Sequence, residues 1–295
     1  AMKLGMIAMS GVRAANPELT AFGLTLPGFV ERSKVIASLP SLSLLTLAAL
    51  TPPEIEVEYR EIRDLDEQPE SPRDYDLVAI SSLSSQIFDA YRIADLYRER
   101  GVPVVMGGLH VTVRPEEARA HGAVAVVGEG EMSWGRIMAD FARGHLEPEY
   151  RPPPGEWLDL ADAPMPRYEL LEPERYNRLT VQTSRGCPHR CDFCASSILL
   201  TPGYRVKPVE KVIAEIRRIK EVWPHPFIEF ADDNSFVLRR HYKRLMQALK
   251  DEHVKWFTEA DISIAEDPEL LDLMRESGCR QVLIGLESPV ADGLD

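Results

Sequence analysis

Three of the chain's four cysteines lie within eight residues, at a spacing that suits an iron-sulfur cluster. Cys187, Cys191 and Cys194 stand in the stretch Ser-Arg-Gly-Cys-Pro-His-Arg-Cys-Asp-Phe-Cys. Three thiolates on one short loop can bind three irons of a four-iron, four-sulfur cluster, which leaves the fourth iron open to a small-molecule ligand. We therefore predict these cysteines as metal ligands.

A structural zinc site is the main alternative for this loop. Zinc closes four ligands, usually as two separated pairs, whereas here three cysteines stand together. His189 lies inside the loop and would complete a zinc site only awkwardly. A disulfide framework fits less well, because Cys279 is distant in sequence and the chain is long enough to need no such cross-links.

The cysteine loop also carries Phe193 directly before its last cysteine, and this pattern resembles the signature of radical S-adenosylmethionine (SAM) enzymes. The resemblance implies that the open iron binds the amino and carboxylate groups of SAM and that Phe193 contacts SAM. It also implies that an electron from the cluster cleaves the sulfonium bond to give a 5'-deoxyadenosyl radical. In such enzymes the cofactor supplies the difficult chemistry, while the protein positions it and excludes water and oxygen.

From residue 179 onward, the pattern alternates strands and helices, as in a (βα) barrel. The expected strands are 179–183, 227–230, 254–259 and 282–284, and the expected helices are 208–222, 240–251 and 268–277. Radical SAM cores usually have six such units, so about four units over residues 178–295 predict an incomplete, partial barrel. We therefore expect the chain to be truncated.

Polar residues follow the later strands, and in a barrel the loops after strands gather on one face. By the resemblance, the residues that contact SAM are Asp232, Asp233 and Asn234 for its amino group, with Glu259, Glu287 and Ser288 for its ribose and methionine moieties. The Asp-Asp-Asn stretch has a second interpretation as a helix cap, because Asp and Asn favour that position. The two interpretations are compatible.

Residues 1–143 alternate short apolar runs with amphipathic segments, which is typical of a parallel sheet flanked by helices. The expected strands are 4–9, 55–59, 77–81, 102–106 and 123–127, and the expected helices are 42–50, 85–100, 115–121 and 132–143. This pattern predicts an α/β domain with a Rossmann-like or flavodoxin-like fold. Such folds bind ligands at the carboxyl ends of their strands.

Three turns at those carboxyl ends are rich in small residues, which lets the backbone approach a ligand closely. A dinucleotide site is disfavoured, because the turn with Gly128 and Gly130 lacks the third glycine of Gly-x-Gly-x-x-Gly. The turns instead resemble those of the cobalamin-binding domain that precedes the radical SAM core in one large subgroup. By the resemblance, the cobalamin contacts are Ser82, Ser84, Gly107, Gly108, His110, Gly128 and Gly130.

The Asp-x-His-x-x-Gly motif, which supplies an axial histidine to cobalt in many cobalamin domains, is absent. The most similar stretch has Asp251 and His253 at the first two motif positions, but Trp256 stands where the motif has glycine, and the stretch lies in the second domain. If cobalamin binds, its lower face lacks that histidine. A domain that keeps the fold and binds no cofactor stays open as an alternative.

Residues 144–177 hold seven prolines and predict an interdomain linker between domains at 1–143 and 178–295. The net charge of −13 disfavours binding to nucleic acid phosphates or anionic membrane. No apolar run approaches the ~18 residues of a membrane span. Free clustered thiols fit a reducing cytoplasm. A small-molecule substrate and an electron donor such as flavodoxin or ferredoxin are the expected partners.

Together these features favour cobalamin-dependent methylation of an unactivated carbon of a small molecule, with a 4Fe-4S cluster, SAM and cobalamin as cofactors. One alternative is a radical SAM enzyme that forms rings or oxidises its substrate without methyl transfer. Another is a cobalamin-binding or metal-binding fragment without catalysis. The sequence does not name the substrate, because function depends on sites built on a fold rather than on the fold itself.

Overall fold

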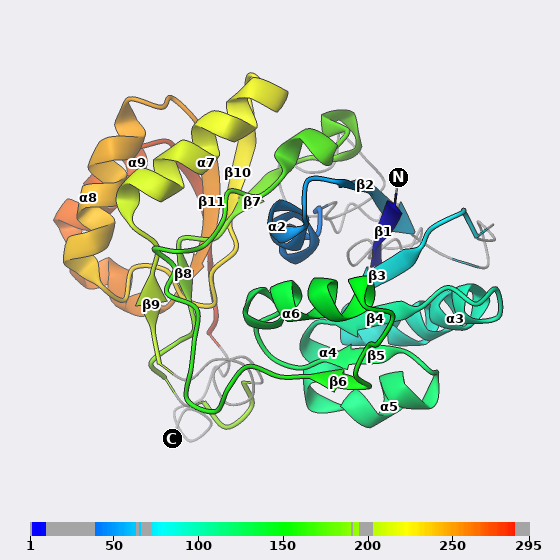
Figure 1. Ribbon diagram of the computed structural model, residues 1–295. Coiled ribbons are helices and arrows are strands. Elements are labelled where there is room, and N and C mark those ends of the chain that lie inside the picture. The colour runs from blue at the N-terminus through cyan, green and yellow to red at the C-terminus, as the bar shows by residue number, and fades with distance from the viewer. Residues whose placement is uncertain are drawn as a thin grey trace, which may run out of the picture. The chain divides into compact units, whose positions relative to one another are not determined.

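The computed structural model describes residues 2–9, 39–62, 65, 72–189, 191–194 and 203–286 (Figure 1). The chain divides into two compact units, which are Ala1–Leu158 with Asp162–Asn177, and Asp159–Ala161 with Arg178–Asp295. Each unit is built on its own parallel sheet.

The sheet of the first unit has six parallel strands in the order β2-β1-β3-β4-β5-β6. Its strands are β1 (Met2–Met9), β2 (Ile55–Ile62), β3 (Leu77–Ser81), β4 (Val104–Gly107), β5 (Val124–Val126) and β6 (Glu149–Tyr150). The first five follow the flavodoxin-like order, which confirms the predicted fold. The strand order reverses between β1 and β3, and folds of this kind bind ligands at the carboxyl ends of the strands at that point.

Helices cover both faces of this sheet (Figure 1). They are α2 (Leu42–Leu50), α3 (Ile87–Arg98), α4 (Leu109–Val113), α5 (Pro115–Ala120) and α6 (Glu131–Ala142). α3, α4 and α5 contribute buried side chains to one core cluster, and α2 and α6 contribute to the other. The central strands are therefore buried on both sides, which explains why they read as continuous apolar runs.

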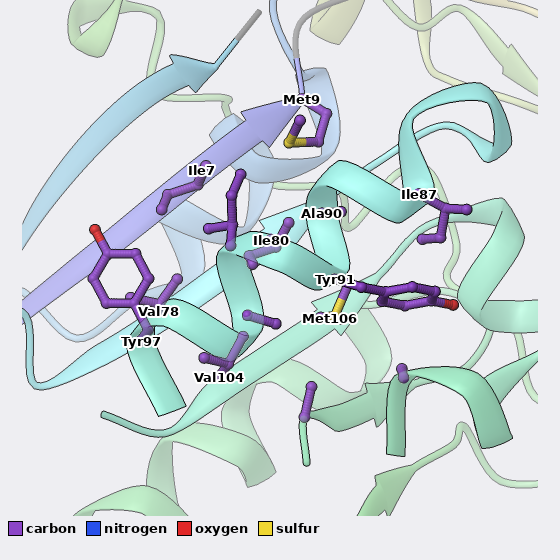
Figure 2. Packing of buried hydrophobic residues seen from close by; sticks show 14 of the residues in the cluster. Ile7, Met9, Val78, Ile80, Ile87, Ala90, Tyr91, Tyr97, Val104 and Met106 are labelled. Carbon is purple, nitrogen blue, oxygen red and sulfur yellow. The ribbon is translucent and has the colours of Figure 1, made fainter. Parts of the chain in front are cut away.

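Alternate residues of each strand enter the two core clusters. Figure 2 shows Ile7, Val78 and Ile80 of the sheet packed with Ala90 and Tyr97 of α3. The residues between them on the same strands belong to the cluster under α2 and α6. The two-residue period of a strand thus divides one apolar run between two cores.

The second unit has a four-stranded parallel sheet in the order β12-β11-β10-β7. Its strands are β7 (Leu179–Val181), β10 (Phe227–Phe230), β11 (Lys255–Ala260) and β12 (Cys279–Ile284), and its helices are α7 (Val209–Val222), α8 (Arg239–Lys250) and α9 (Pro268–Glu276). α8 packs against both α7 and α9 (Figure 1). This arrangement agrees with the predicted partial barrel of about four units.

One face of this second sheet is covered and the other is polar. Ile228, Phe230 and Trp256 are fully buried, and the rings of Phe230 and Trp256 stack with centroids 4.8 Å apart. Glu229 and Phe257, which alternate with them, lie opposite each other in the strand register and are only partly buried. The polar face therefore carries side chains that the hydrophobic core does not need.

Most long elements lie where the sequence predicts them, and the differences are short. The sequence analysis missed α4, β6 and a two-residue antiparallel pair, β8 (Ser184–Arg185) with β9 (Arg205–Val206). Elements of two to five residues carry too little periodicity to be recognised, and their hydrogen bonds are decided by partners distant in sequence.

Residues 144–177, expected as a linker, supply β6 to the first sheet. Tyr168 and Tyr150 of this stretch are fully buried. In the part of the chain that the structure describes, no helix combines the length and apolarity needed to cross a bilayer.

Replacing Gly278 by alanine should strongly destabilise the second unit. Gly278 has a φ of 101°, and an added Cβ would lie 2.0 Å from the carbonyl oxygen of Val254. Strain and clash together should lower the free energy of unfolding by about 2–4 kcal/mol, measured by urea unfolding with circular dichroism.

Gly203→Ala is the matched control for this change. Gly203 also has a positive φ, 84°, but no atom of the described residues lies within 4 Å of its added Cβ. Only backbone strain then opposes alanine, and the loss should be about 1–2 kcal/mol. Equal losses in the two variants would contradict the close approach of Gly278 to Val254.

Candidate functional site

The two ends of the cysteine loop are held together at its base. β8 pairs with β9, with Arg185 opposite Arg205. The backbone N–H of Lys207 donates to the carbonyl of Thr183 at 2.8 Å. The loop therefore leaves the end of β7 and returns to the same place.

A buried ion pair fastens the returning end of the loop to α7. Lys207 and Glu215 lie 2.6 Å apart, with side chains 4% and 3% exposed. Burial raises the pKa of Glu215, and the charge of Lys207 opposes that shift. Removal of either partner would leave an unpaired buried charge, so the pair fixes this connection firmly.

None of the three cysteines of the loop forms a disulfide in the described part of the chain. Cys187 and Cys194 are partly buried, and Cys191 is exposed. A turn brings the last two together, because the N–H of Cys194 donates to the carbonyl of Cys191 at 2.9 Å. Within the described ranges, no three His, Cys, Asp or Glu side chains are gathered as a group able to hold a metal ion. The assignment of these thiols as ligands stays a prediction.

Asp232, at the end of β10, braces the residues that lead into the cysteine loop. Its carboxylate accepts from the backbone N–H groups of Thr183 and Ser184 at 2.7 and 2.9 Å. The hydroxyls of Thr183, Ser235 and Tyr242 also donate to it, the last two at 2.8 and 3.1 Å. Burial raises the pKa of Asp232, and the hydrogen bonds from Thr183, Ser184 and Ser235 oppose that shift. Its carboxylate thus joins β7, β10 and α8.

Asp233 holds the turn that opens the cysteine loop. Its Oδ2 accepts from the N–H of Gly186 at 2.9 Å. Gly186 has a φ of 86°, a conformation that glycine adopts readily and other residues do not. Asp232 and Asp233 therefore hold the backbone that leads into this glycine and the N–H of the glycine itself. Their predicted contacts with SAM stay predictions.

The side chain of Asn234 lies between the first cysteine and the end of β11. Its Nδ2 is 3.8 Å from the Sγ of Cys187 and 2.9 Å from the Oδ2 of Asp261. The N–H of Asp261 donates back to the Oδ1 of Asn234 at 3.2 Å. Asn234 is 5% exposed, so this amide is a buried link between the loop and the sheet.

Asp261 carries a strongly stabilised negative charge. Burial alone would raise its pKa, but hydrogen bonds from Ser263 and Asn234 and the charge of His189 lower the pKa of Asp261 to about 2. His189 Nε2 lies 3.6 Å from Asp261 Oδ2. A second residue of the cysteine loop is therefore drawn toward this carboxylate.

The polar face of the second sheet carries Arg178, Glu229 and Glu259. Arg178 and Glu229 form an ion pair at 2.5 Å, with side chains 11% and 13% exposed, and the Arg178 guanidinium lies 5.1 Å from the centre of the Phe257 ring. Partial burial raises the pKa of Glu259, Arg178 opposes that shift, and Asp233 adds to it. Glu259 keeps contact with solvent at the strand end, so it is accessible to a ligand.

The remaining predicted SAM contacts differ in position. Phe193 is 70% exposed, so its ring is available to a ligand. Glu287 and Ser288 lie outside the described residues, and their roles stay predictions.

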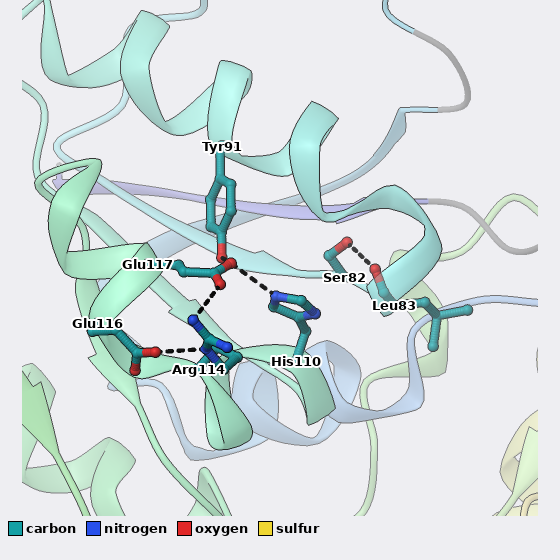
Figure 3. A network of polar contacts seen from close by, with 7 residues as sticks. All are labelled: Ser82, Leu83, Tyr91, His110, Arg114, Glu116 and Glu117. Atoms are coloured by element: carbon teal, nitrogen blue, oxygen red, sulfur yellow. Dashed lines mark hydrogen bonds and ion pairs between the residues drawn. The ribbon is translucent and has the colours of Figure 1, made fainter.

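In the first unit, the strand ends pack backbone against backbone. Gly108 follows β4 with a φ of 106°, and a Cβ there would lie 2.9 Å from the carbonyl oxygen of Ser82. Ser82 is buried and donates its hydroxyl to the carbonyl of Leu83 at 2.9 Å (Figure 3). A Cβ added at Gly107 would lie 3.7 Å from the Cβ of Val126. Three of the predicted cobalamin contacts are thus adjacent at the ends of β3 and β4.

His110 belongs to a polar cluster formed by α3, α4 and α5 (Figure 3). Its Nε2 lies 3.1 Å from the Oε2 of Glu117, which also accepts from the hydroxyl of Tyr91 at 3.2 Å, and Arg114 pairs with the other oxygen at 3.2 Å. The hydrogen bond from His110 lowers the pKa of Glu117, and burial opposes that shift. An ionised carboxylate only accepts, so Nε2 carries the proton and is not free to bind a metal.

The turn after β5 contains the last predicted cobalamin contacts. The N–H of Gly128 donates to the hydroxyl oxygen of Thr112 at 3.0 Å, and Gly130 precedes α6. In the first turn of α6, Ser133 is 1% exposed, and its Oγ is buried without a hydrogen bond partner in the structure. Ser84, by contrast, is exposed after β3.

Sequence reasoning missed most of the residues that hold this site together. No sequence motif marks four of these residues, which are Thr183, Ser235, Tyr242 and Lys207. Their hydrogen-bond partners lie 3 to 59 positions away along the chain. The one available sign was the run Asp232-Asp233-Asn234 after a buried strand.

Two family models match the chain. The B12 binding domain matches residues 36–134, and the radical SAM superfamily matches residues 181–294. The first match spans β2 to β5 of the first sheet, and the second spans β10 to β12 of the second sheet.

Among curated relatives, bacteriochlorophyllide d C-8(2)-methyltransferase of Chlorobaculum tepidum is 29% identical over 263 residues, which cover 84% of this chain and 57% of that protein. An uncharacterized methyltransferase of Synechocystis sp. is 32% identical over 267 residues, covering 87% of this chain and 49% of that protein. The chain spans about half the length of these relatives.

Among solved structures, the radical S-adenosylmethionine methyltransferase TsrM of Kitasatospora setae, with tryptophan substrate and a SAM analogue bound, matches with a TM-score of 0.70. The identity is 17%, and the match covers 99% of this chain and 60% of that one. At this identity the likeness concerns the fold.

Asp261→Asn should remove a contribution to stability that depends on pH. The folded pKa of about 2 lies below the usual value near 3.9, so the charge of Asp261 stabilises the fold above about pH 4. That contribution is lost as the pH falls through 2. We expect the variant to be less stable by about 1–2 kcal/mol at pH 6, with a gap that narrows below pH 4, in urea unfolding.

Asp272→Asn is the control for this measurement. Asp272 is on α9, 69% exposed, and its ion pair with Arg275 is equally exposed, so its loss should change stability little at any pH. A gap for Asp261→Asn that stays constant from pH 6 to pH 3 would contradict the assigned charge.

Proposed function

This chain belongs to the radical SAM superfamily and carries a B12 binding domain ahead of its radical SAM domain, and we propose that it methylates an unactivated carbon of a small molecule. One observation carries the proposal. Three cysteines on one loop, outside any disulfide, occur in the same chain as a separate sheet of flavodoxin-like order with glycine-rich strand ends.

The donor set of the cysteine loop suits a 4Fe-4S cluster. Cys187, Cys191 and Cys194 offer three thiols without disulfide partners, and Asn234 directs an amide N–H toward one of them. When bound, the cluster with SAM supplies a 5'-deoxyadenosyl radical, and cobalamin supplies the methyl group. The task of these residues is to hold the cluster by three irons and leave the fourth open.

The strand ends of the first unit suit cobalamin. Gly107 and Gly108 keep the backbone free of side chains beside Ser82. The buried hydroxyl of Ser133 has no hydrogen-bond partner among the described residues, and a polar group of a ligand could supply one. The Nε2 of His110 is hydrogen-bonded to Glu117, so His110 would contact the cofactor without offering that nitrogen to cobalt. This fits the absence of the Asp-x-His-x-x-Gly motif.

The chain's own residues would position SAM at the ends of β7, β10 and β11. Phe193 and Glu259 are the described candidates with solvent contact, and Glu259 would complement the ammonium group of SAM. Asp232 and Asp233 would act on the loop backbone rather than on SAM. We assign the cobalamin role to residues 1–143, the connection to residues 144–177, and the SAM role to residues 178–295.

The partners and location follow from the same chemistry. A cluster that must be reduced requires an electron donor, for which flavodoxin or ferredoxin is the expected class. Exposed free thiols such as Cys191 favour a reducing cytoplasm, and the net charge of −13 disfavours nucleic acid as a substrate.

Cys191→Ser should abolish cluster binding and SAM cleavage. Wild-type protein reconstituted without oxygen should hold about four iron and four sulfide per chain, and the variant well under half of that, with no 5'-deoxyadenosine formed. Elemental analysis and chromatography of the products check both outcomes.

Cys279→Ser is the matched control. Cys279 lies outside the loop, partly buried, and burial raises its pKa to about 12, so it stays a thiol. The control should retain full iron content and SAM cleavage. Zinc in place of iron in the wild type, or an intact cluster that never cleaves SAM, would refute the proposed function.

His110→Ala should leave cobalamin binding and the corrin spectrum nearly unchanged. The imidazole Nε2 donates to Glu117, so removing the side chain takes no Nε2 ligand from cobalt. Retention after gel filtration should stay within about twofold of the wild type. A shifted corrin absorbance in the variant would contradict this expectation. Folded wild type that binds no cobalamin when cobalamin is in excess would refute the cobalamin assignment.

A further inference from the structure

The side-chain amide of Asn234 donates a hydrogen bond to a cysteine of the loop. Its Nδ2 lies 3.8 Å from the Sγ of Cys187, within the range of an N–H···S hydrogen bond. Asn234 is 5% exposed. Water therefore competes little for this donor.

Asp261 fixes which way this amide points. Its carboxylate can only accept and so selects the NH₂ end of Asn234, at 2.9 Å, while its backbone N–H can only donate and selects the carbonyl end, at 3.2 Å. With one amide hydrogen directed at Asp261, the second is left for the sulfur of Cys187. In the flipped amide, the NH₂ group would face the backbone N–H of Asp261, and the carbonyl oxygen would face the Asp261 carboxylate. Each contact would then pair two donors or two acceptors.

The surroundings hold both partners in place. The N–H of Ser263 donates to the other oxygen of Asp261 at 2.8 Å, and the hydroxyl of Tyr204 donates to the backbone carbonyl of Asn234 at 3.2 Å. Asp261 and Asn234 are therefore each held by a contact that does not involve the cysteine. The donor is thus preorganised for whatever charge the sulfur carries.

Resting on the proposed iron-sulfur cluster, we propose that Asn234 is a positioning residue that makes the cluster easier to reduce, acting through the sulfur of Cys187. A reduced cluster carries one more negative charge, part of it on its sulfur ligands. A hydrogen bond donated to such a sulfur stabilises the reduced state more than the oxidised state, and hydrogen bonds to sulfur are among the factors that set cluster potentials. The amide therefore favours the electron transfer that starts SAM cleavage.

The test replaces the donor without changing its size. Asn234→Asp keeps an oxygen for the N–H of Asp261 and removes the N–H from the sulfur in either protonation state. An ionised carboxylate only accepts, and the single hydrogen of a protonated one goes to Asp261. Asn234→Ala removes the donor without adding charge, so it separates the loss of the hydrogen bond from the added charge.

The readout is the midpoint potential of the cluster in SAM-free full chain, followed by electron paramagnetic resonance during a redox titration. Gln247→Glu is the control, because it makes the same amide-to-carboxylate change at an exposed position on α8. Both Asn234 variants should have lower potentials, with reduction about tenfold less favourable, which is about 59 mV for one electron. The control should match the wild type.

Each outcome decides something different. Unchanged potentials in both variants at full iron content would overturn the inference and leave the proposed function intact. Loss of the cluster in both variants would also overturn it, because Asn234 would then be a purely structural residue. A wild type that binds no iron-sulfur cluster would refute the proposed function itself.

Discussion

A buried carboxylate at the end of β10 organises the second unit. Asp232 accepts hydrogen bonds from the backbone of Thr183 and Ser184, directly before the cysteine loop, and from side chains on two further elements. A carboxylate without partners would be very costly in such a buried position, so the fold has to supply donors for it. Those donors fix the backbone from which the cysteine loop departs.

Three consecutive residues, 232–234, bind three different points of the cysteine loop and the backbone before it. Asp232 binds the backbone before Gly186, Asp233 binds the N–H of Gly186, and Asn234 reaches the sulfur of Cys187. They act on successive points of the loop because they follow β10, and parallel strands bring their carboxyl ends to one edge of the sheet. A polar run that resembles a ligand-binding segment is therefore also the support of the cysteine loop.

The first unit follows the same principle with different chemistry. Its strand ends carry glycines in place of carboxylates, and Gly108 packs against the carbonyl of Ser82 where any side chain would clash. The polar cluster around Glu117 occupies His110 and keeps its Nε2 protonated. One unit thus offers thiols and acidic groups and the other offers strand ends with glycines, which agrees with two different cofactors.

The sequence by itself determined the cysteine spacing, the α/β class and nearly all long elements. These depend on local properties: residue type, a period of two or 3.6 residues, and the turn residues between runs. Tertiary structure alone decided the β8–β9 closure, the buried pair of Lys207 and Glu215, and the assignment of Asn234 to Cys187 and Asp261. The physical reason is that a hydrogen bond or ion pair forms between groups that folding brings within about 3 Å. Asn234 lies 2.9 Å from Asp261, 27 positions away, and 3.8 Å from Cys187, 47 positions away, only because the strands that precede these residues pair.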